Sequence, residues 1–421
     1  MTSQLTPILS SPGWDILTSW ENRPERAAID PLTLGTMLRA QGISAEIATA
    51  VASQLALRDA AEAKFGLIAR TMVFTREGLE QASRLLVATL HADRFRAAGI
   101  THLADLGCGI GTESLAAAGL GLDVTAFDID EDAVGAAAVN LRHFPNARVA
   151  RADVTDIDLA DLVAEGVDGI FADPARRKGS TRIKNPQNWS PPLSTVLSWR
   201  DTIPALGVKM APGIDHSALP ADTHVQWVSI DGDLVEAALW TPPLAPEGPG
   251  RSAHIIRDGR AHILTDPALL AANERQRLAP HGKLGAFLAE ADDAVIRAGL
   301  LATLAESVDG HLIDPKIAYI TADSLEPSPF MRIFDVLEEC PLRPKAIRPV
   351  LKRLGISDIE VKKRGADIDP SKFRSAILGS SARKGAGAST GEADADNSGV
   401  VFATRIQGQH RAIIARRADR D

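Results

Sequence analysis

The sequence predicts an α/β protein built around a doubly wound parallel sheet, because two features of its central part point to that fold. Between residues 101 and 243, short apolar runs alternate with helical segments; the runs are HLADL, DVTAFD, ARVARAD, VDGIFAD, LGVKMA, HVQWVSI and VEAALW. Strands and helices that alternate at this spacing build a parallel sheet with helices on both faces. The second feature is a glycine-rich turn directly after the first run. The short turn Asp231-Gly232-Asp233 predicts that the last two runs form an antiparallel hairpin at the sheet edge.

Four parts are expected along the chain. Residues 1–95 are predicted to form a helical domain, in which Asp30 and Ser44 cap two helices and a third begins near Arg76. The sheet occupies residues 96–243. Residues 244–332 are expected to be a linker and a helical connection, and residues 333–421 a smaller α+β domain.

Three local predictions concern the second half of the chain. Residues 284–306 have a helical pattern of apolar residues. Residues 379–399 contain no large apolar residue and are expected to be disordered. The segment after them, VVFATRIQGQHRAIIAR, is predicted to be a β-hairpin that turns at Gln407-Gly408.

The overall composition excludes several classes of protein. The chain has 421 residues and a formal net charge of −8, which argues against a protein that coats polyanions over its whole surface. Its two cysteines, Cys108 and Cys340, give neither a disulfide framework nor a metal-ligand spacing, so no metal is predicted. No apolar run approaches the roughly 18 residues that span a bilayer, and the beginning of the chain has no secretion signal. We therefore expect a cytoplasmic protein without a membrane partner.

The glycine-rich turn has the sequence 105-DLGCGIG-111, with the spacing G-x-G-x-G. Thr112 stands where the dinucleotide-binding motif G-x-G-x-x-G has its last glycine. Glycines let the backbone bend tightly and approach a ligand closely, although turns of this kind also simply join a strand to a helix. Asp105, Gly107, Gly109 and Gly111 are the candidate residues for a bound cofactor.

Acidic residues at the ends of successive strands strengthen this interpretation. Asp128 ends the second run, where a bidentate acceptor suits ribose hydroxyls; Asp153 ends the third and Asp173 the fourth. A single aspartate at such a place can also be the cap of the following helix. Four acids at four strand ends, beginning with the glycine turn, favour a nucleoside-containing cofactor.

This arrangement resembles the class I S-adenosylmethionine-dependent methyltransferases over roughly residues 75–243. The resemblance implies a Rossmann-like sheet of seven strands whose final strand is antiparallel, and S-adenosylmethionine as the cofactor. It also implies that Asp105 and the three glycines shape the methionine side of the pocket. Asp128 would hold the ribose, Ile129 would lie on the adenine face, and Asp153 would reach the adenine amino group.

The fourth run leads into 170-IFADPARRKGSTRIK-184, where this superfamily places residues that contact the methyl acceptor. Asp173 and Pro174 are the candidate catalytic residues. Many base methyltransferases carry Asp-Pro-Pro and an aromatic residue there, whereas this chain has Ala175 and Arg176, so the stacking residue is missing from its usual place. RNA 5-methyluridine methyltransferases carry Asp-Pro-Pro-Arg but need a cysteine nucleophile near the fifth strand, and the corresponding run LGVKMAPGID has none. Its Lys209 either faces the acceptor or closes the strand end.

Five cations follow Asp173, and they suit contacts with a polynucleotide backbone or a solvated loop equally well. They are Arg176, Arg177, Lys178, Arg182 and Lys184. Trp189 is a candidate for stacking on a base, but a tryptophan between prolines more often packs against its own domain.

The C-terminal part resembles the THUMP-like domain, which follows a methyltransferase domain in a family of bacterial proteins. The resemblance rests on 343-RPKAIRPVLKRLGISDIEVKKRGADIDPSKFRSAIL-378 and the terminal hairpin, with support from 284-LGAFLAEADDAVIRAGL-300 and 74-FTREGLEQAS-83. THUMP domains bind tRNA in several modification enzymes, so the resemblance suggests an RNA partner. Clustered cations on a helix end and a strand agree with a polyanion site, or form a face that only confers solubility; they are Lys352, Arg353, Lys362, Lys363 and Arg364.

The sequence thus favours an S-adenosylmethionine-dependent methyltransferase that acts on RNA, with tRNA as the first candidate and Asp173 as the residue that orients the acceptor. Two alternatives stay open. The acceptor could be a protein or a small molecule, or the chain could be an RNA-binding protein whose methyltransferase fold no longer catalyses a reaction.

Overall fold

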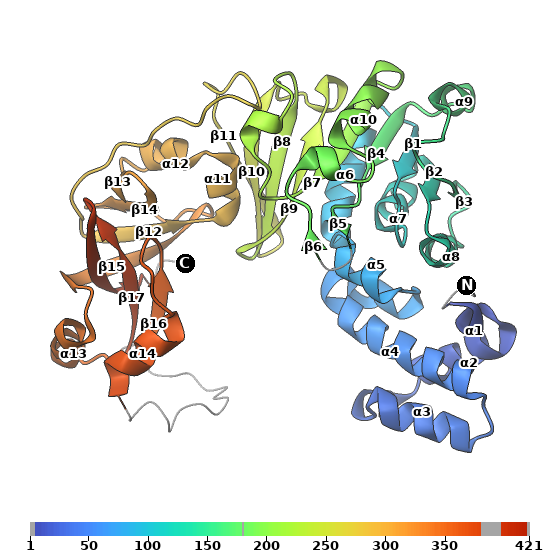
Figure 1. The fold of residues 1–421 in the computed structure, drawn as a ribbon, viewed down its shortest axis with the longest axis horizontal. Coiled ribbons are helices and arrows are strands. Elements are labelled where there is room, and N and C mark those ends of the chain that lie inside the picture. The colour runs from blue at the N-terminus through green and yellow to red at the C-terminus, as the bar shows by residue number, and fades with distance from the viewer. Residues whose placement is uncertain (1–4, 179–180, 380–396, 419–421) are drawn as a thin grey trace. The chain divides into compact units, whose positions relative to one another are not determined.

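The computed structural model describes residues 5–178, 181–379 and 397–418, and the chain divides into two compact units. Unit 1 comprises Met1–His224 with Ala237–Pro249, and unit 2 comprises Val225–Glu236 with Gly250–Asp421. Figure 1 shows the elements in both. The four predicted domain ranges remain predictions.

The N-terminal part is helical, as the sequence predicts. Asp30 accepts hydrogen bonds from the backbone of Leu32 and Thr33, and Ser44 accepts one from Ile47, so both predicted caps are confirmed. The helix expected from Arg76 is divided into two. The helices are α1 (Thr6–Leu9), α2 (Ser11–Glu21), α3 (Pro31–Ala40), α4 (Ala45–Phe65), α5 (Arg76–Gln81) and α6 (Leu85–Ala97), with short 3₁₀ turns η1 (Pro24–Ala28) and η2 (Gly66–Thr71).

Five parallel strands follow, and they alternate with helices as expected. The strands are β1 (His102–Leu106), β2 (Asp123–Asp128), β3 (Ala147–Arg151), β4 (Gly169–Ala172) and β7 (Ala205–Met210); the helices are α7 (Thr112–Gly119), α8 (Glu131–Asn140), α9 (Leu159–Ala164) and α10 (Leu193–Ser198). Phe65 of α4 and Phe95 of α6 share one buried cluster with Leu103 of β1 and Trp240. The N-terminal helices thus pack on the sheet that carries the glycine turn.

The order of the strands confirms the fold and corrects its size. β9 (Asp233–Trp240) runs antiparallel to β7, as the resemblance implies. The full order is β11-β10-β8-β9-β7-β4-β1-β2-β3, so the sheet has nine strands instead of seven. The additional strands are β10 (Gly250–Arg257) and β11 (Arg260–Thr265), which lie beyond β8 (His224–Ile230). The β8–β9 hairpin is therefore not at the edge, because β10 satisfies the open backbone groups of β8.

A second sheet has seven strands in the order β13-β14-β12-β15-β18-β17-β16. Its strands are β12 (Phe287–Ala291), β13 (His311–Asp314), β14 (Ile317–Ala322), β15 (Met331–Pro341), β16 (Asp358–Lys363), β17 (Ser398–Ile406) and β18 (Gln409–Arg417); the helices are α11 (Asp293–Ala298), α12 (Leu301–Ser307), α13 (Pro344–Arg353) and α14 (Pro370–Leu378). Along β17, Phe402 packs in one core and Val401 in another. Successive side chains of a strand face opposite sides, so both faces of the sheet are buried.

Three local predictions for this half of the chain have different outcomes. The terminal hairpin is confirmed: it turns at Gln407 and Gly408, both with positive φ. The helix expected over 284–306 is wrong at its start, because residues 287–291 pair as β12 with β14 and β15, and this pairing overrides the local pattern. Most of the segment expected to be disordered, 380–396, lies outside the described residues, but Ser398 and Gly399 belong to β17.

None of the helices in the described part of the chain is long and apolar enough to cross a membrane.

Candidate active site

The glycine turn between β1 and α7 is the first part of the site. Gly107, Gly109 and Gly111 all have positive φ, and the backbone N–H groups of Gly107 and Cys108 both donate to Phe127 O at 2.9 Å. A Cβ atom on Gly107 would lie 2.9 Å from the carbonyl oxygen of Asp173, whereas one on Gly109 would meet nothing within 4 Å. Gly107 is therefore required by the close approach of two strand ends, and Gly109 borders open space.

Asp128 fastens this turn to the end of β2. Its Oδ2 accepts a hydrogen bond from Gly109 N at 2.8 Å, and its Oδ1 accepts one from Asp130 N at 2.9 Å. Burial raises the pKa of Asp128. A carboxylate offers about four lone-pair positions, so two remain for hydroxyl donors.

Ile129 and Asp153 extend the same edge of the sheet. Ile129 is 60% exposed, which is unusual for a large apolar side chain and leaves its face open to a ligand. Asp153 lies two residues beyond β3, and its carboxylate accepts hydrogen bonds from Thr155 N and Oγ1, which lower its pKa. The bond from Ala152 N to Asp128 O places the ends of β2 and β3 side by side.

Asp105 lies beneath the glycine turn and is fully buried. Its Oδ2 accepts hydrogen bonds from Ser114 N at 3.1 Å and Ser114 Oγ at 2.6 Å. Within the described residues, Oδ1 has no partner. Burial raises the pKa of Asp105 to about 7, although the Ser114 bonds oppose the shift. A buried acceptor with an unused oxygen fits a ligand that brings a hydrogen-bond donor to the turn.

This raised pKa predicts a dependence of stability on pH. The unfolded carboxyl ionises near 3.8 and the folded one near 7, so between these values the folded state binds more protons and its stability falls as pH rises. We expect the free energy of unfolding of Asp105→Asn, measured relative to the native protein without cofactor, to rise by up to about 4 kcal/mol between pH 4 and pH 8. Denaturant unfolding across that range measures it. A difference that stays constant with pH would contradict the assignment.

Asp173 stands at the end of β4 next to the glycine turn. Its backbone N–H donates to Leu106 O at 3.2 Å, and its Oδ2 lies 2.9 Å from Lys209 Nζ. Lys209 is 5% exposed and also donates to Gln81 O, so it faces Asp173 as well as closing the end of β7. The guanidinium of Arg176 is more distant, at 3.9 Å from Oδ1. From β1 the chain adds β2 and β3 on one side of the sheet and then β4 and β7 on the other, so the order reverses between β1 and β4. Sheets of this kind bind ligands at such a reversal, and the glycine turn and Asp173 both lie there.

A buried polar chain under the site was not predicted from the sequence. Ser83 Oγ donates to Glu113 Oε1 at 2.7 Å, and Glu113 Oε2 lies 3.1 Å from His91 Nδ1. His91 stacks on Phe171 of β4 with 5.1 Å between ring centroids. Ser83 lies in the turn between α5 and α6, so the N-terminal helices are tied to α7, the helix that follows the glycine turn. The spacing of these residues in the sequence gives no sign that they contact one another. Lys209, by contrast, stands out in the sequence as a single cation within an apolar run.

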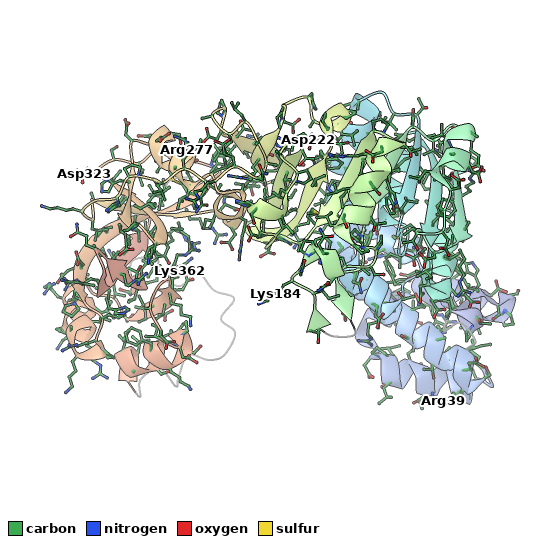
Figure 2. The ribbon with its side chains drawn as sticks, turned by 45° about the horizontal axis from the view of Figure 1, so that its top comes forward. Arg39, Lys184, Asp222, Arg277, Asp323 and Lys362 are labelled. Carbon is green, nitrogen blue, oxygen red and sulfur yellow. The ribbon has the colours of Figure 1, made fainter. Side chains whose placement is uncertain are left out.

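The cations that follow Asp173 lie on a small two-stranded ribbon. Arg177 and Lys178 form β5 and pair with β6, Thr181–Arg182, but the side chains of Arg177, Lys178 and Arg182 lie outside the described part of the structure. Lys184 is exposed and is labelled in Figure 2. Trp189 is 3% exposed and donates from Nε1 to Ile183 O at 3.2 Å. It packs within its own domain and offers no ring for stacking on a base.

The C-terminal cations lie on a helix end and a strand, as predicted, but most of them have partners. Arg353 forms an ion pair with Glu338 and Lys362 one with Glu290, while Arg364 lies 3.7 Å from Asp293. Lys363 Nζ donates to Ile368 O. The free positive charge of this surface is therefore smaller than the sequence alone indicates.

Neither cysteine has the environment of a nucleophile. Cys108 and Cys340 are free thiols, both buried, and burial raises the pKa of each. Thiols of this kind react poorly because the thiolate is the reactive form. Among the described residues, we find no group of three or more His, Cys, Asp or Glu side chains that could hold a metal ion.

Two family models match this chain. Residues 64–185 match a "Methyltransferase small domain", and residues 331–417 match a "THUMP domain-like" family. The first match contains the glycine turn, Asp128, Asp153 and Asp173. The second contains β15 to β18 and the C-terminal cations.

Two relatives in Mycobacterium tuberculosis, from strains CDC 1551 / Oshkosh and H37Rv, are named uncharacterized S-adenosylmethionine-dependent methyltransferases. Each is 32% identical over 309 residues, which cover 72% of this chain and 80% of the relative. The chain belongs to the S-adenosylmethionine-dependent methyltransferases. The enzyme therefore uses S-adenosylmethionine as its cofactor.

A solved structure agrees with this methyltransferase fold over the whole chain. It is a methyltransferase candidate from Porphyromonas gingivalis W83, with a TM-score of 0.69 and 19% identity over 98% of this chain and 100% of that one. The likeness extends through both units, so the combination of the two sheets is shared.

Proposed function

We propose that this methyltransferase modifies RNA, with tRNA as the first substrate to test, and that Asp173 orients the acceptor base. The observation that carries the proposal is the position of Asp173. Its main chain closes against Gly107 of the cofactor turn, and its carboxylate is fixed by Lys209 at 2.9 Å. An acceptor held by this carboxylate lies beside the cofactor turn.

We assign roles to the cofactor-binding residues from their common position at the carboxyl ends of the parallel strands. Asp128 accepts the ribose hydroxyls, the exposed side chain of Ile129 covers one face of the adenine, and Asp153 reaches its amino group. Asp105 and the glycines at 107, 109 and 111 line the methionine side. The unused oxygen of Asp105 and the open space at Gly109 support a ligand there.

Asp105, the glycine turn and Asp128 would hold S-adenosylmethionine, which would supply an electrophilic methyl group to the acceptor. The chain's own contribution is to position the acceptor and to receive its proton or hydrogen bond. Pro174 restricts Asp173 to extended conformations, which aims the carboxylate along the strand. Lys209 holds Oδ2, so Oδ1 remains for the acceptor, with Arg176 3.9 Å away.

RNA is the favoured acceptor for two reasons. Residues 331–417 match the THUMP-like family, and THUMP domains bind tRNA in several modification enzymes. Arg176 lies 3.9 Å from Asp173, and the exposed Lys184 follows Ile183, whose N–H donates to Arg176 O. Cations at these places suit contacts with the phosphates of a polynucleotide. Protein and small-molecule acceptors remain the alternative. Most of the C-terminal cations are paired with acidic residues, and this pairing reduces the free positive charge that would attract RNA.

The proposal predicts where a labelled methyl group goes. Purified enzyme and labelled cofactor are added to an extract from cells that lack the enzyme, and the label is counted separately in RNA, DNA, protein and small molecules. We expect most of it in RNA and its release by ribonuclease. Label that resists ribonuclease and is released by protease would favour a protein acceptor instead.

A further inference from the structure

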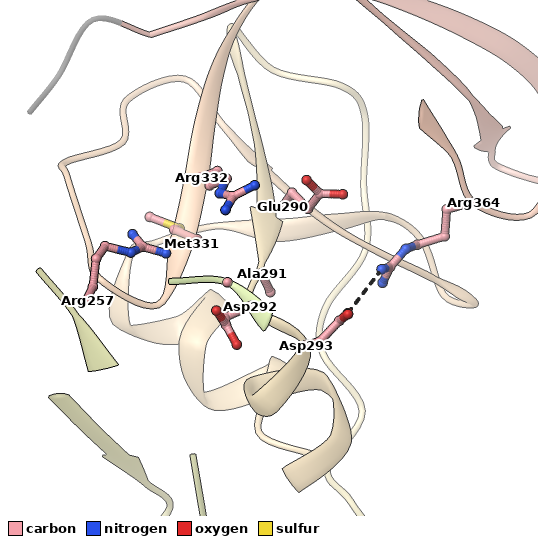
Figure 3. A pocket seen from close by; sticks show the side chains of 9 residues that line it. Arg257, Glu290, Ala291, Asp292, Asp293, Met331, Arg332 and Arg364 are labelled. Atoms are coloured by element: carbon pink, nitrogen blue, oxygen red, sulfur yellow. Dashed lines mark ion pairs between the residues drawn. The ribbon is translucent and has the colours of Figure 1, made fainter. Parts of the chain in front are cut away.

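Unit 2 contains a polar cavity of about 200 Å³, and of the candidate RNA-binding cations discussed above only Arg364 lines it. Figure 3 shows it from close by, with Arg257 and Arg332 on one side and Arg364 on the other. The cavity lies where β10, β12, β15 and the end of β16 meet the turn at Gly232, and these residues all belong to the same unit. Its remaining lining residues are Glu290, Ala291, Asp292, Asp293 and Met331.

Three carboxylates line this cavity, and only that of Glu290 forms a close ion pair. Glu290 stands opposite Arg332 in the β12–β15 register, but its carboxylate forms an ion pair with Lys362. Asp292 accepts a hydrogen bond from Ala294 N as the cap of α11, and Asp293 faces Arg364 at 3.7 Å.

Two arginines are left without a counter-ion. In the described part of the chain, neither Arg257 nor Arg332 takes part in an ion pair. Arg332 Nη2 lies 3.5 Å from the carbonyl oxygen of Asp231. Two guanidinium groups that face one cavity repel each other unless an anion lies between them.

Arg332 and Arg364 already pack against other residues before any ligand arrives. A Cβ atom on Gly232 would lie 2.4 Å from Arg332 Nη2, so the missing side chain of this glycine makes room for the guanidinium. Arg364 lies over the ring of the buried Tyr319, 5.4 Å from its centroid. Arg364 also interacts with the Tyr319 side chain, but its distance of 3.7 Å from Asp293 exceeds a hydrogen bond, so the donors that face Asp293 are available to a better acceptor.

We infer that this cavity binds a phosphate group, held by Arg257 and Arg332 with Arg364 on the opposite side. Planar guanidinium forks match phosphate oxygens in geometry and charge. That the phosphate belongs to the RNA backbone rests on the proposed function. The cavity residues that would anchor the substrate belong to unit 2, whereas Asp173 belongs to unit 1.

Point substitutions test phosphate binding in the cavity better than removal of the C-terminal part does. A cut near residue 333 would divide β15, which pairs with both β12 and β18, and the second sheet would lose its centre. The test therefore uses the full chain with Arg257→Ala and Arg332→Ala together. The matched control is Arg275→Ala with Lys316→Ala, which removes the same charge from exposed positions of unit 2 outside the cavity.

The first measurement uses inorganic phosphate at constant ionic strength. Phosphate should raise the melting temperature of the native protein and of the control, and should have little effect on the cavity variant. Equal responses in all three proteins would overturn the inference.

The second measurement uses tRNA and identifies the source of the phosphate. The cavity variant should bind tRNA about tenfold more weakly, and the slope of log K against log salt should become shallower by about one to two. The control should stay within about twofold. A phosphate response with unchanged tRNA affinity would reject the RNA source, and would leave a phosphorylated small molecule as the ligand. If the label described above enters RNA while the cavity variant behaves as the control, the inference fails and the proposed function stands.

Discussion

Replacement of Asp173 by asparagine slows methyl transfer by about 100-fold or more at saturating cofactor and RNA, because a neutral amide cannot take the proton or the charge-assisted hydrogen bond of the attacking group. Asparagine is preferred to alanine for a structural reason. Lys209 is 5% exposed and pairs with Asp173 at 2.9 Å, and the asparagine oxygen can still accept its hydrogen bond. Single-turnover kinetics with enzyme in excess measure the step directly.

Two controls make the result for Asp173 specific. Asp123→Asn changes an exposed aspartate at the opposite, amino end of β2 and should leave the rate within about twofold. The affinity of Asp173→Asn for S-adenosylhomocysteine should also be unchanged, since the loss concerns the acceptor side. A normal rate for a folded Asp173→Asn protein would mean that this aspartate only ends a strand.

Replacement of Asp128 by alanine weakens the binding of S-adenosylhomocysteine about tenfold or more. The expected loss is that of charge-assisted hydrogen bonds to the ribose, on the order of 1.5–3 kcal/mol. The same change frees Gly109 N, which Asp128 Oδ2 holds at 2.8 Å, so the glycine turn also loses its tie to β2. Calorimetric titration of the full chain measures the affinity.

Asp123→Ala is the matched control for Asp128, because it removes the same charge from the same strand at the far end of the sheet. Its affinity for S-adenosylhomocysteine should equal that of the native enzyme. If Asp128→Ala is folded and binds as tightly as this control, the second strand end does not hold the ribose.

Features that depend on neighbouring residues in the chain could be predicted from the sequence. The caps at Asp30 and Ser44 and the hairpin turn at Gln407-Gly408 follow from local backbone requirements. The gathering of Asp105, Asp128 and Asp173 followed from one rule, since the carboxyl ends of parallel strands share an edge.

Features that depend on pairing between distant segments could not be predicted. Residues 287–291 have a helical pattern, and only the neighbouring strands β14 and β15 make them a strand. The C-terminal cations looked free because their partners, such as Glu290 for Lys362, come from strands far away in the sequence. The same holds for the Lys209–Asp173 pair, which joins two strand ends 36 residues apart.

The central claim is that the enzyme methylates RNA and needs Asp173 to do so. Its most direct test is mass spectrometry of nucleosides from the RNA of cells that lack this enzyme. We expect one methylated nucleoside to be missing, and to reappear when the RNA is incubated with S-adenosylmethionine and the native enzyme but not with Asp173→Asn. Identical nucleoside profiles with and without the enzyme, or equal restoration by Asp173→Asn, would contradict the account.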